Sequence, residues 1–445
     1  MSKLNEILNK ISIPNEKCIK GSIYLPLSID EASIEWSSSR PEVISDKVDK
    51  KKAPGVVKRE LNDCEVTLIC RVSIDGESAT KEFALNVCGL REHIKEEDYA
   101  GYLFAHFIGE ENENSEQIYF SVSQDGLHFK DMHNLKPVLT SNVGEKGVRD
   151  PYICRSHDGD RFFMVATDLS IYNRGGWKKN EQGYYDPSTT GSDSLVFWES
   201  DDLINWSEPR LLKVAPTNAG MAWAPEMVYN DETDEYIIFF SSSIMNPETK
   251  YKAKPNTIFY VATRDFIHFS KTDIFIDNQC DGDPENKARE IIDTTVIKVG
   301  NYYYSASKDG DNDEACGGIR IMKNTDLLNP NGWEKVLDLD ELGLNLSGLD
   351  INVLDNTSLE GPELFIYNKK DWADSMVPEY GIIADQYMAG TGYLPLKTTD
   401  FEDKDNKNGS WKVLSKEEYS FDKLKKRHGT IINITEKELE NLKQL

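Results

Sequence analysis

The sequence predicts an all-β protein: a five-bladed β-propeller preceded by a small β-sandwich. Three observations support this. A strand-entry motif recurs five times, a series of Asp-aromatic turns has the same number of members, and about 80 residues of short alternating strands precede both. In the first copy of the motif, Pro151 suits the start of a strand because it fixes its own φ and lacks a backbone donor. The copies begin at Val148, Trp223, Ile292, Glu360 and Arg427.

The spacing of the motif indicates a repeat architecture. The marker residues Asp150, Glu226, Asp293, Glu360 and His428 are 76, 67, 67 and 68 residues apart. Strand-rich repeats of this length are typical of propeller blades with about four strands each. In the second series, we expect the Asp to cap a turn and the ring to pack between blades. Its pairs are Asp125 with Phe129, Asp202 with Trp206, Asp265 with Phe269, Asp326 with Trp333, and Asp400 with Trp411.

The two ends of the repeat region are offset. Two strands, at 102–107 and 118–123, come before the first strand-entry motif, whereas the last motif, at His428, is followed only by a helix. We therefore expect the C-terminal strand to be the inner strand of a blade whose outer strands come from residues 102–129, which closes the ring without free edges. The final helix has a capping box, Thr435 with Glu438, and we expect it to bury Leu439 and Leu442.

The predicted domains are an immunoglobulin-like β-sandwich at 1–90, a charged linker at 91–98, and the propeller with its C-terminal helix at 99–445. The first ten residues suit a short helix, and Asp75-Gly76 is a hairpin signal. The segment 34–41, IEWSSSRP, resembles part of bacterial immunoglobulin-like modules. We see no chemistry in this domain and expect it to pack against the propeller or to space it. Its role and the oligomeric state of the protein stay open.

The composition limits the partners. The 445 residues carry a net charge of −26, so nucleic acid and anionic membrane are disfavoured, whereas a neutral oligosaccharide is not. A strongly acidic balance is also a common solubility feature. No signal peptide or membrane span is visible. Seven cysteines with no export signal suggest reduced thiols and a cytoplasmic location. Cys64 and Cys70 alternate with other residues on one strand face, which favours buried core over a metal site.

The strand-entry motifs bring carboxylates together. Inner strands of a propeller start at one end of its central channel, so the five markers converge there. Neighbouring carboxylates do not share one pKa, and one can act as an acid while another acts as a base. Hydrolysis of a glycosidic bond needs this pair of roles. The long connection 170–192, with Trp177, Tyr184 and Tyr185, suits a pocket rim, and a mobile insertion is the alternative.

These motifs resemble those of glycoside hydrolase family 43 over about residues 99–445. The segments RDPYI, IDTTVI and LEGPELF occur in the family's order, and WAPEMVY and RHGTIINIT also match. The resemblance implies an inverting mechanism with Asp150 as general base, Glu360 as general acid, and Asp293 orienting Glu360. It also implies a histidine near the channel, His428, often beside bound calcium, although no cofactor is required. One departure is Thr294, where the family usually has Pro.

The remaining site candidates are assigned to substrate binding. Trp223 could stack on a sugar ring or pack against the next blade, and Glu226 could bind hydroxyls. Arg149 could contact the substrate or pair with a carboxylate instead. His428 is a substrate contact, a channel-lining histidine, or a metal ligand.

The sequence therefore predicts an exo-acting glycosidase that releases α-L-arabinofuranose, or β-D-xylose, from oligosaccharides. A fructosidase-type or phosphorolytic enzyme of a related five-bladed family is one alternative. Fructosidases, however, have an EC acid segment where this chain has EGPE. The other alternative is a non-catalytic propeller that binds sugar or protein. Loss of one of the three carboxylates would favour it, and none is lost.

Overall fold

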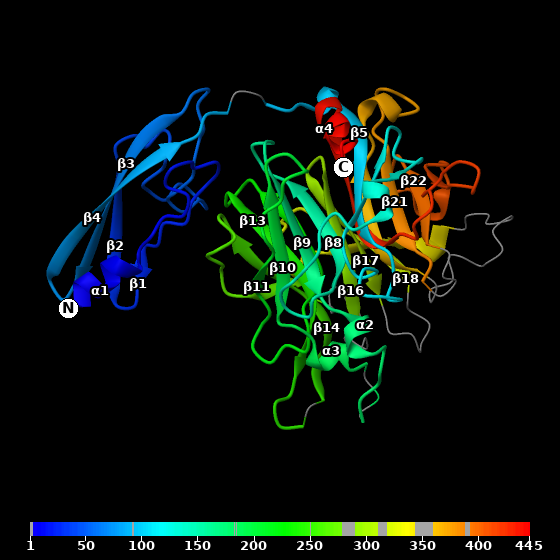
Figure 1. The fold of residues 1–445 in the computed structure, drawn as a ribbon, viewed down its shortest axis with the longest axis horizontal. Coiled ribbons are helices and arrows are strands. Elements are labelled where there is room, and N and C mark those ends of the chain that lie inside the picture. The colour runs from blue at the N-terminus through cyan, green and yellow to red at the C-terminus, as the bar shows by residue number, and fades with distance from the viewer. Residues whose placement is uncertain are drawn as a thin grey trace.

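The computed structural model describes residues 3–90, 93–181, 183, 185–249, 251–277, 290–309, 318–342, 359–387 and 392–445. Tyr184 of the long connection and two of the seven cysteines, Cys280 and Cys316, lie outside these residues. The all-β prediction is confirmed: the described strands form six four-stranded antiparallel sheets. Five of them make the propeller, and the sixth belongs to the small N-terminal domain beside it (Figure 1).

Each blade runs from an inner strand to an outer one. The sheet order is β8-β9-β10-β11, β12-β13-β14-β15, β16-β17-β18-β19, β20-β21-β22-β23 and β24-β5-β6-β7. The bounds are β5 Tyr99–Phe107, β6 Tyr119–Ser123, β7 Lys130–Asp131, β8 Val148–Arg155, β9 Phe162–Asp168, β10 Ser194–Ser200, β11 Arg210–Lys213, β12 Trp223–Asn230, β13 Glu235–Met245, β14 Lys252–Thr263, β15 Asp273–Ile276, β16 Ile291–Val299, β17 Tyr302–Asp309, β18 Gly318–Asn324, β19 Glu334–Asp338, β20 Glu360–Ile366, β21 Tyr380–Asp385, β22 Tyr393–Thr398, β23 Trp411–Val413 and β24 Arg427–Thr435.

The ring closes as predicted. The C-terminal strand β24 pairs with β5, so that Gly429 lies opposite His106. The inner strands contact one another in the order β8, β12, β16, β20, β24 and back to β8. Helix α4 (Glu436–Leu442) follows β24 and packs on β5, with Leu439 and Leu442 buried. Its capping box is formed, since Glu438 N donates to Thr435 Oγ1 and Thr435 N donates to Glu438 Oε2.

The Asp-aromatic turns have the predicted structural role. In each turn the Asp carboxylate accepts a hydrogen bond from the backbone N–H two residues later, as Asp202 does from Ile204. The five aromatic rings lie in five different hydrophobic clusters, all between blades. The turns therefore hold each outer edge in register and fill the wedge between neighbouring sheets.

The remaining helices are short. They are α1 (Lys3–Lys10), α2 (Ile171–Arg174), α3 (Pro187–Thr190), and the 3-10 turns Glu96–Asp98, His133–Leu135, Leu339–Leu342, Lys369–Asp371 and Lys404–Asn406. In the part of the chain that the structure describes, no helix is long and apolar enough to cross a membrane.

The N-terminal domain is built on one sheet. Its strands are β1 (Ser28–Ile29), β2 (Ala32–Ser38), β3 (Cys64–Ile74) and β4 (Glu77–Val87), in that order. The predicted hairpin at Asp75-Gly76 joins β3 to β4, and both residues have positive φ. The buried face carries Cys70, as predicted, and is covered by α1 and by largely irregular chain at 11–25 and 43–57. The inner face of this sheet is thus packed against a helix and mostly irregular chain, where a β-sandwich would have a second sheet.

One expectation about the cysteines is wrong. Cys18 and Cys88 form a disulfide, whereas the odd cysteine count suggested reduced thiols throughout. The two residues are 70 positions apart and meet because residue 19 bridges to Val87 at the end of β4. No periodicity in the sequence reports this pairing.

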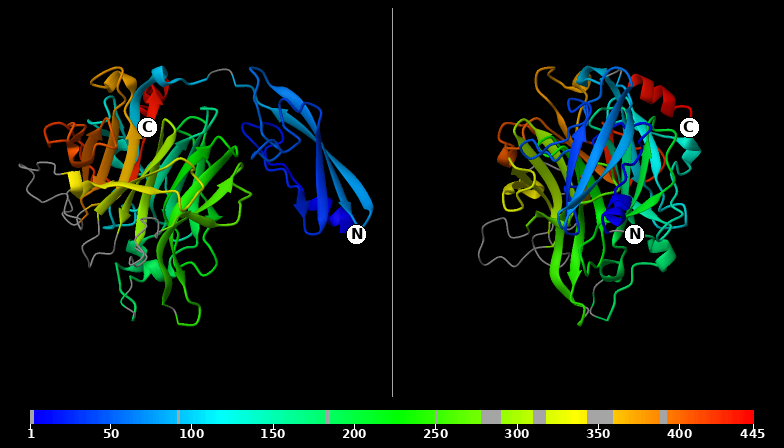
Figure 2. Two further views of the ribbon diagram at one scale, coloured as in Figure 1. Left: turned by 180° about the vertical axis from the view of Figure 1, so that it is seen from behind. Right: turned by 90° about the vertical axis from the view of Figure 1, so that its left-hand side faces the viewer.

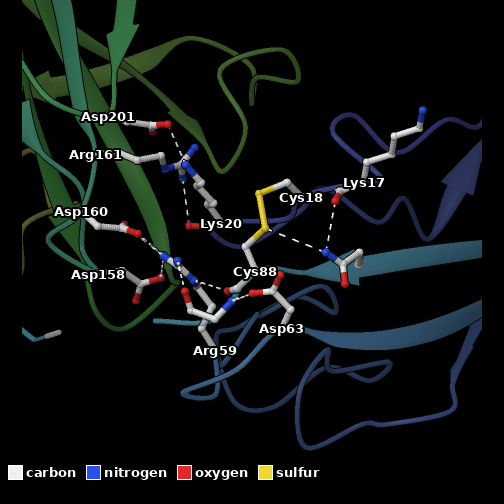
Figure 3. Close-up of a disulfide and its surroundings, with 12 residues drawn as sticks. Lys17, Cys18, Lys20, Arg59, Asp63, Cys88, Asp158, Asp160, Arg161 and Asp201 are labelled. Atoms are coloured by element: carbon white, nitrogen blue, oxygen red, sulfur yellow. Dashed lines mark hydrogen bonds and ion pairs between the residues drawn. A yellow bond between two sulfur atoms is a disulfide. The ribbon is translucent and has the colours of Figure 1, made fainter. Parts of the chain in front are cut away.

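The two domains are in direct contact. Figure 3 shows the disulfide beside this interface, where the buried Arg59 pairs with Asp158 and Asp160 of the propeller. At another point of the same interface, Lys20 Nζ lies 2.7 Å from Asp201 Oδ2. The small domain lies beside the propeller, against its first two blades (Figure 2).

Candidate active site

Every inner strand is entered through a β-bulge at the same place. The register shifts between Arg149 and Tyr152 in β8, and at the corresponding position in the other four inner strands. A bulge inserts a residue and re-aims its side chain. In four blades the bulged residue has a positive φ: Asp150, Ala224, Asp293 and Gly361. In the fifth blade His428 takes the equivalent place.

This register corrects the marker series. Glu360 lies one residue before the bulged Gly361, and Glu226 lies two residues after Ala224. The side chains at the mouth of the channel are therefore those of Asp150, Asp293 and His428, with Glu360 beside them. Glu226 belongs to a deeper layer, together with Glu363.

The bulges are held by side chains from the preceding blade. A bulge leaves a backbone N–H without its ladder partner, and a buried N–H needs another acceptor. Ala224 N donates to Thr167 Oγ1 at 2.7 Å, and Asp293 N donates to Ser241 Oγ at 3.3 Å. Gly361 N donates in turn to Asp293 Oδ2 at 3.1 Å. Asp293 is thus held by Ser241 of the preceding blade. In turn it holds the backbone of the next blade beside Glu360.

Asp150 is an ionised carboxylate. Its Oδ1 lies 3.3 Å from His428 Nδ1, and its Oδ2 accepts a hydrogen bond of 2.8 Å from Thr167 Oγ1. Burial by itself raises the pKa of Asp150, but the hydrogen bond from His428 and the charges of His428 and Arg149 outweigh it and lower the pKa below 3.8. Burial lowers the pKa of His428, yet Asp150 and Asp293 together raise it to about 9, so its imidazole is cationic near neutral pH.

Asp293 behaves in the opposite way. Burial raises the pKa of Asp293 to about 6, and the charges of Glu360 and Asp150 add to this against the opposing effect of His428. Two carboxyl groups at one end of the channel thus have their pKa values pushed apart by their surroundings. Such a separation is typical of sites that use one group as a base and control the proton of another.

Glu360 lies between two cations. Lys308 Nζ is 3.2 Å from its Oε2, and Arg427 Nη2 is 3.0 Å from its Oε1. Arg427 also pairs with the fully buried Asp385, and Lys308 lies over the ring of Tyr387. The carboxyl group is therefore held from both sides by groups that are themselves fixed.

His428 separates Asp150 from Glu360. Strand β24 lies between β8 and β20, and an alanine Cβ at position 361 would be 2.8 Å from His428 Cγ. The ring is thus in contact with Asp150 on one side and the Glu360 segment on the other. The Nδ1 atom of His428 is engaged by Asp150. Among the described residues, no group of three or more His, Cys, Asp or Glu could hold a metal ion.

The rim of the site is formed by the long connection after β9. Trp177 Nε1 donates to both oxygens of Glu110, and Arg149 Nη1 lies 2.5 Å from Glu110 Oε1. Arg149 also pairs with the buried Glu116 at 3.2 Å, which is the carboxylate pairing considered from the sequence. The rings of Trp177 and Trp223 meet edge to face with centroids 6.2 Å apart. Two aromatic faces and a partly exposed carboxylate thus line the edge of the site.

Glu226 and Glu363 form a buried pair below the first layer. Glu226 is 4% exposed. Burial and the neighbouring Glu363 raise the pKa of Glu226 well above 4.5, and burial raises that of Glu363 to about 8 even though Glu226 lowers it. Both pKa values are thus raised, so this pair is protonated more readily than free glutamates, and Glu363 Oε1 also accepts a hydrogen bond from Ile431 N.

Several residues of the site were not found from the sequence: Thr167, Lys308, Asp385 and Glu110. The first three share a position. Each lies at the end of the second strand of its blade, opposite or next to the residue that precedes the bulge. Counting residues along each hairpin, from the motif to the position opposite it, would have pointed to them. The extra residue of the bulge makes that count uncertain. Glu110 lies in the loop just after β5, and no motif that repeats along the chain marks this position.

The chain is similar to known proteins. A family model described as "Probable glycosyl hydrolase domain", for proteins related to glycoside hydrolase family 43, matches residues 97–440. The chain is 28% identical over 308 residues to an alpha-L-arabinofuranosidase of Bifidobacterium longum subsp. longum, a match that covers 62% of this chain and 27% of that relative. The chain thus spans well under two thirds of that relative's length.

Two solved structures also match the chain. An alpha-L-arabinofuranosidase from Lactobacillus brevis matches with 15% identity, 62% of this chain, 74% of that chain and a TM-score of 0.37. An alpha-L-arabinanase from Penicillium chrysogenum matches with 13% identity, 80% and 81% coverage and a TM-score of 0.40. Because the family model spans most of the chain, this protein belongs to the family 43-related glycosyl hydrolases.

Proposed function

We propose that this glycoside hydrolase removes terminal α-L-arabinofuranosyl residues from neutral oligosaccharides, with inversion at the anomeric carbon. β-D-Xylosides are the second substrate class. The observation that carries the proposal is the cluster of Asp150, Asp293 and Glu360 at one end of the channel, two of them with pKa values pushed in opposite directions. The arabinofuranoside is supported by the similarity to an alpha-L-arabinofuranosidase.

In the proposed mechanism Asp150 is the general base. Its ionised carboxylate takes a proton from a water molecule, and the water oxygen forms a bond to the anomeric carbon. The bond from that carbon to the leaving oxygen breaks, and Glu360 protonates this oxygen. Asp293 orients Glu360 through the Gly361 backbone, and the cation of His428 holds Asp150 in its ionised form. General acid and base help of this kind is worth about 10²–10⁴-fold each.

Inversion is supported by the place of His428. An inverting pair of carboxyl groups needs about 6.5–9.5 Å between them, whereas a retaining pair needs about 5–5.5 Å. The ring of His428 lies between Asp150 and the segment of Glu360, and each carboxyl group is anchored to its own side by Thr167 or by Lys308 and Arg427. This arrangement favours the wider separation.

The test combines a substrate panel with product stereochemistry. Nitrophenyl pentosides and hexosides are assayed with the native enzyme and with Asp150→Asn and Glu360→Gln, and we expect each variant to lose at least about a hundredfold in turnover. Asp265→Asn, in an outer turn, is the matched control and keeps its activity. Proton NMR of the first product should show the inverted anomer. A product with retained configuration would disprove Asp150 as base, and strong activity on hexosides alone would disprove the pentoside assignment.

Exo action has its own assay. Arabino-oligosaccharides of increasing length should lose one residue at a time, with monosaccharide as the first product by chromatography. Larger fragments as first products would show that the enzyme cleaves internal bonds.

A further inference from the structure

A cavity that none of the candidate active-site residues lines lies between the two domains. Its volume is about 250 Å³, room for about eight water molecules at the liquid density. The N-terminal domain lines it with the segment around Lys20, and the first two blades line it with Arg161, Arg210 and Arg264. Figure 3 shows Lys20 and Arg161 on either side of the domain boundary, next to the disulfide.

The three arginines have no acidic partner. Among the described residues, no carboxylate lies within 4.0 Å of the guanidinium groups of Arg161, Arg210 or Arg264, and their hydrogen bonds go to backbone carbonyls. Arg161 Nη2 donates to Lys20 O at 3.1 Å, and Arg210 Nη1 donates to Phe266 O at 2.7 Å. Arg264 donates to four carbonyl oxygens, two of them, at 53 and 54, across the domain boundary.

This concentration of unpaired cations is unexpected. The chain carries 26 more negative than positive charges, and charged groups that are withdrawn from solvent are normally paired. Arg264 is buried, and Arg161 and Arg210 are half-buried. Arg59, whose side chain is also buried in the interface, follows that rule, since it contacts Asp158 and Asp160. The interface therefore supplies carboxylates for one arginine and leaves the cavity-lining ones without any.

The acidic residues that line the cavity do not neutralise it. Asp265 is committed to its turn, where it accepts from Ile267 N, His268 N and His268 Nδ1. Glu199 lies farther than 4.0 Å from every described cation of the cavity. Burial lowers the pKa of Arg210 in spite of the charges of Glu199 and Asp265, which agrees with an incompletely compensated cation.

The cavity also presents unused donors. Arg161 Nε is buried and has no hydrogen-bond partner. The backbone at Gly21 passes so close to this guanidinium that an alanine Cβ there would lie 2.8 Å from Arg161 Nη2. The loop is anchored next to Cys18, which the disulfide joins to Cys88, and Ile19 N donates to Asn86 O. The donors are thus fixed in position around the cavity.

We propose that this cavity binds a small oxyanion, the phosphate or carboxylate group of a metabolite, held by Arg161 and Arg210 of the propeller and by the N-terminal segment around Lys20. Guanidinium groups match both anions through charge-assisted, bidentate hydrogen bonds. Because the ligand would contact both domains, its binding stabilises their docking.

The test is titration calorimetry of the full chain with inorganic phosphate and with acetate, at constant ionic strength adjusted with chloride. We expect saturable binding of at least one of them, and Arg161→Gln and Arg210→Gln should each weaken it about tenfold to a hundredfold, as loss of a hydrogen bond to a charged group implies. Which anion binds distinguishes the phosphate from the carboxylate. Arg71→Gln, on the outer face of the N-terminal sheet, is the matched control and leaves the affinity unchanged.

Two further variants keep the test decisive. Lys308→Gln removes a cation of the candidate active site, so binding that persists in it comes from elsewhere. If Arg210→Gln does not fold, Gly21→Ala blocks the approach of the loop to Arg161 and should weaken binding in the same way. The proposal is overturned if neither anion binds, or if binding is lost in Lys308→Gln and kept in the arginine variants.

Discussion

Replacing Asp293 with Asn should make the protein more stable. Burial raises the pKa of Asp293 from 3.8 to about 6, so the folded state disfavours the charged carboxylate. Asn mimics the neutral acid and can still accept the hydrogen bond from Gly361 N. The variant therefore removes an electrostatic cost without removing the contact.

The size of the effect follows from the pKa. One pKa unit corresponds to about 1.4 kcal/mol, so the change from 3.8 to about 6 corresponds to about 3 kcal/mol. A raised pKa contributes stability that is present below the unfolded value of 3.8 and is lost as the pH rises through about 6. Asp293→Asn should thus match the native protein near pH 4 and exceed its free energy of unfolding by about 3 kcal/mol at pH 8.

Urea unfolding at these two pH values measures the difference, and Asp150→Asn is the contrasting variant. The pKa of Asp150 is lowered, so its carboxylate stabilises the fold above 3.8 and loses this effect as the pH falls through the folded value. Asp150→Asn leaves the buried cation of His428 without its partner and should lower stability near neutral pH by about 3–5 kcal/mol. If both variants shifted stability in the same direction at pH 8, the electrostatic reasoning would be wrong.

Three further predictions concern the surroundings of the site. Trp177→Ala should raise KM several-fold with little change in kcat, because a rim contact binds ground state and transition state alike, and Trp177→Phe should restore most of the loss; steady-state kinetics on the arabinofuranoside checks both. Glu226→Gln should leave the unfolding free energy near neutral pH within about 1 kcal/mol of native, because Glu226 already carries a proton; a loss of several kcal/mol would show that it is ionised. Arg59→Met should cost about 2–3 kcal/mol of domain docking, seen as two separate thermal transitions where the native protein has one.

The sequence was informative wherever a pattern is local. Strand-entry motifs, Asp-aromatic turns and the final capping box are each encoded within a few residues, and all of them have the predicted structure. The offset of the two ends was enough to predict that β24 pairs with β5. The convergence of Asp150 and Asp293 followed from the repeat alone, because equivalent positions of a ring meet at one end of its axis, and Glu360 lies next to the equivalent position of its own strand.

The exact register of the inner strands could not be predicted from the sequence. The marker series treated Glu226 and Glu360 as equivalent to Asp150. In the structure Glu226 lies two residues after the bulged residue of its strand, and Glu360 lies one residue before the bulged residue of its own. A bulge adds a residue to one strand only, and the hydrophobic pattern of strands buried on both faces does not reveal where. The same uncertainty hid Thr167, Lys308 and Asp385, which reach the site across their hairpins.

What the chain determined by itself is therefore the architecture and the set of chemical groups: five blades, a closed ring, and three carboxylates with a histidine at its mouth. Only the tertiary structure decided which of these groups are ionised and which charged residues pair with them. His428 comes from the last strand of the chain and sets the ionisation of Asp150 from the first blade, while Lys308 and Arg427 take Glu360 between them. Interactions of this kind depend on distances of a few ångströms between residues far apart in sequence, and no periodicity along the chain encodes such distances.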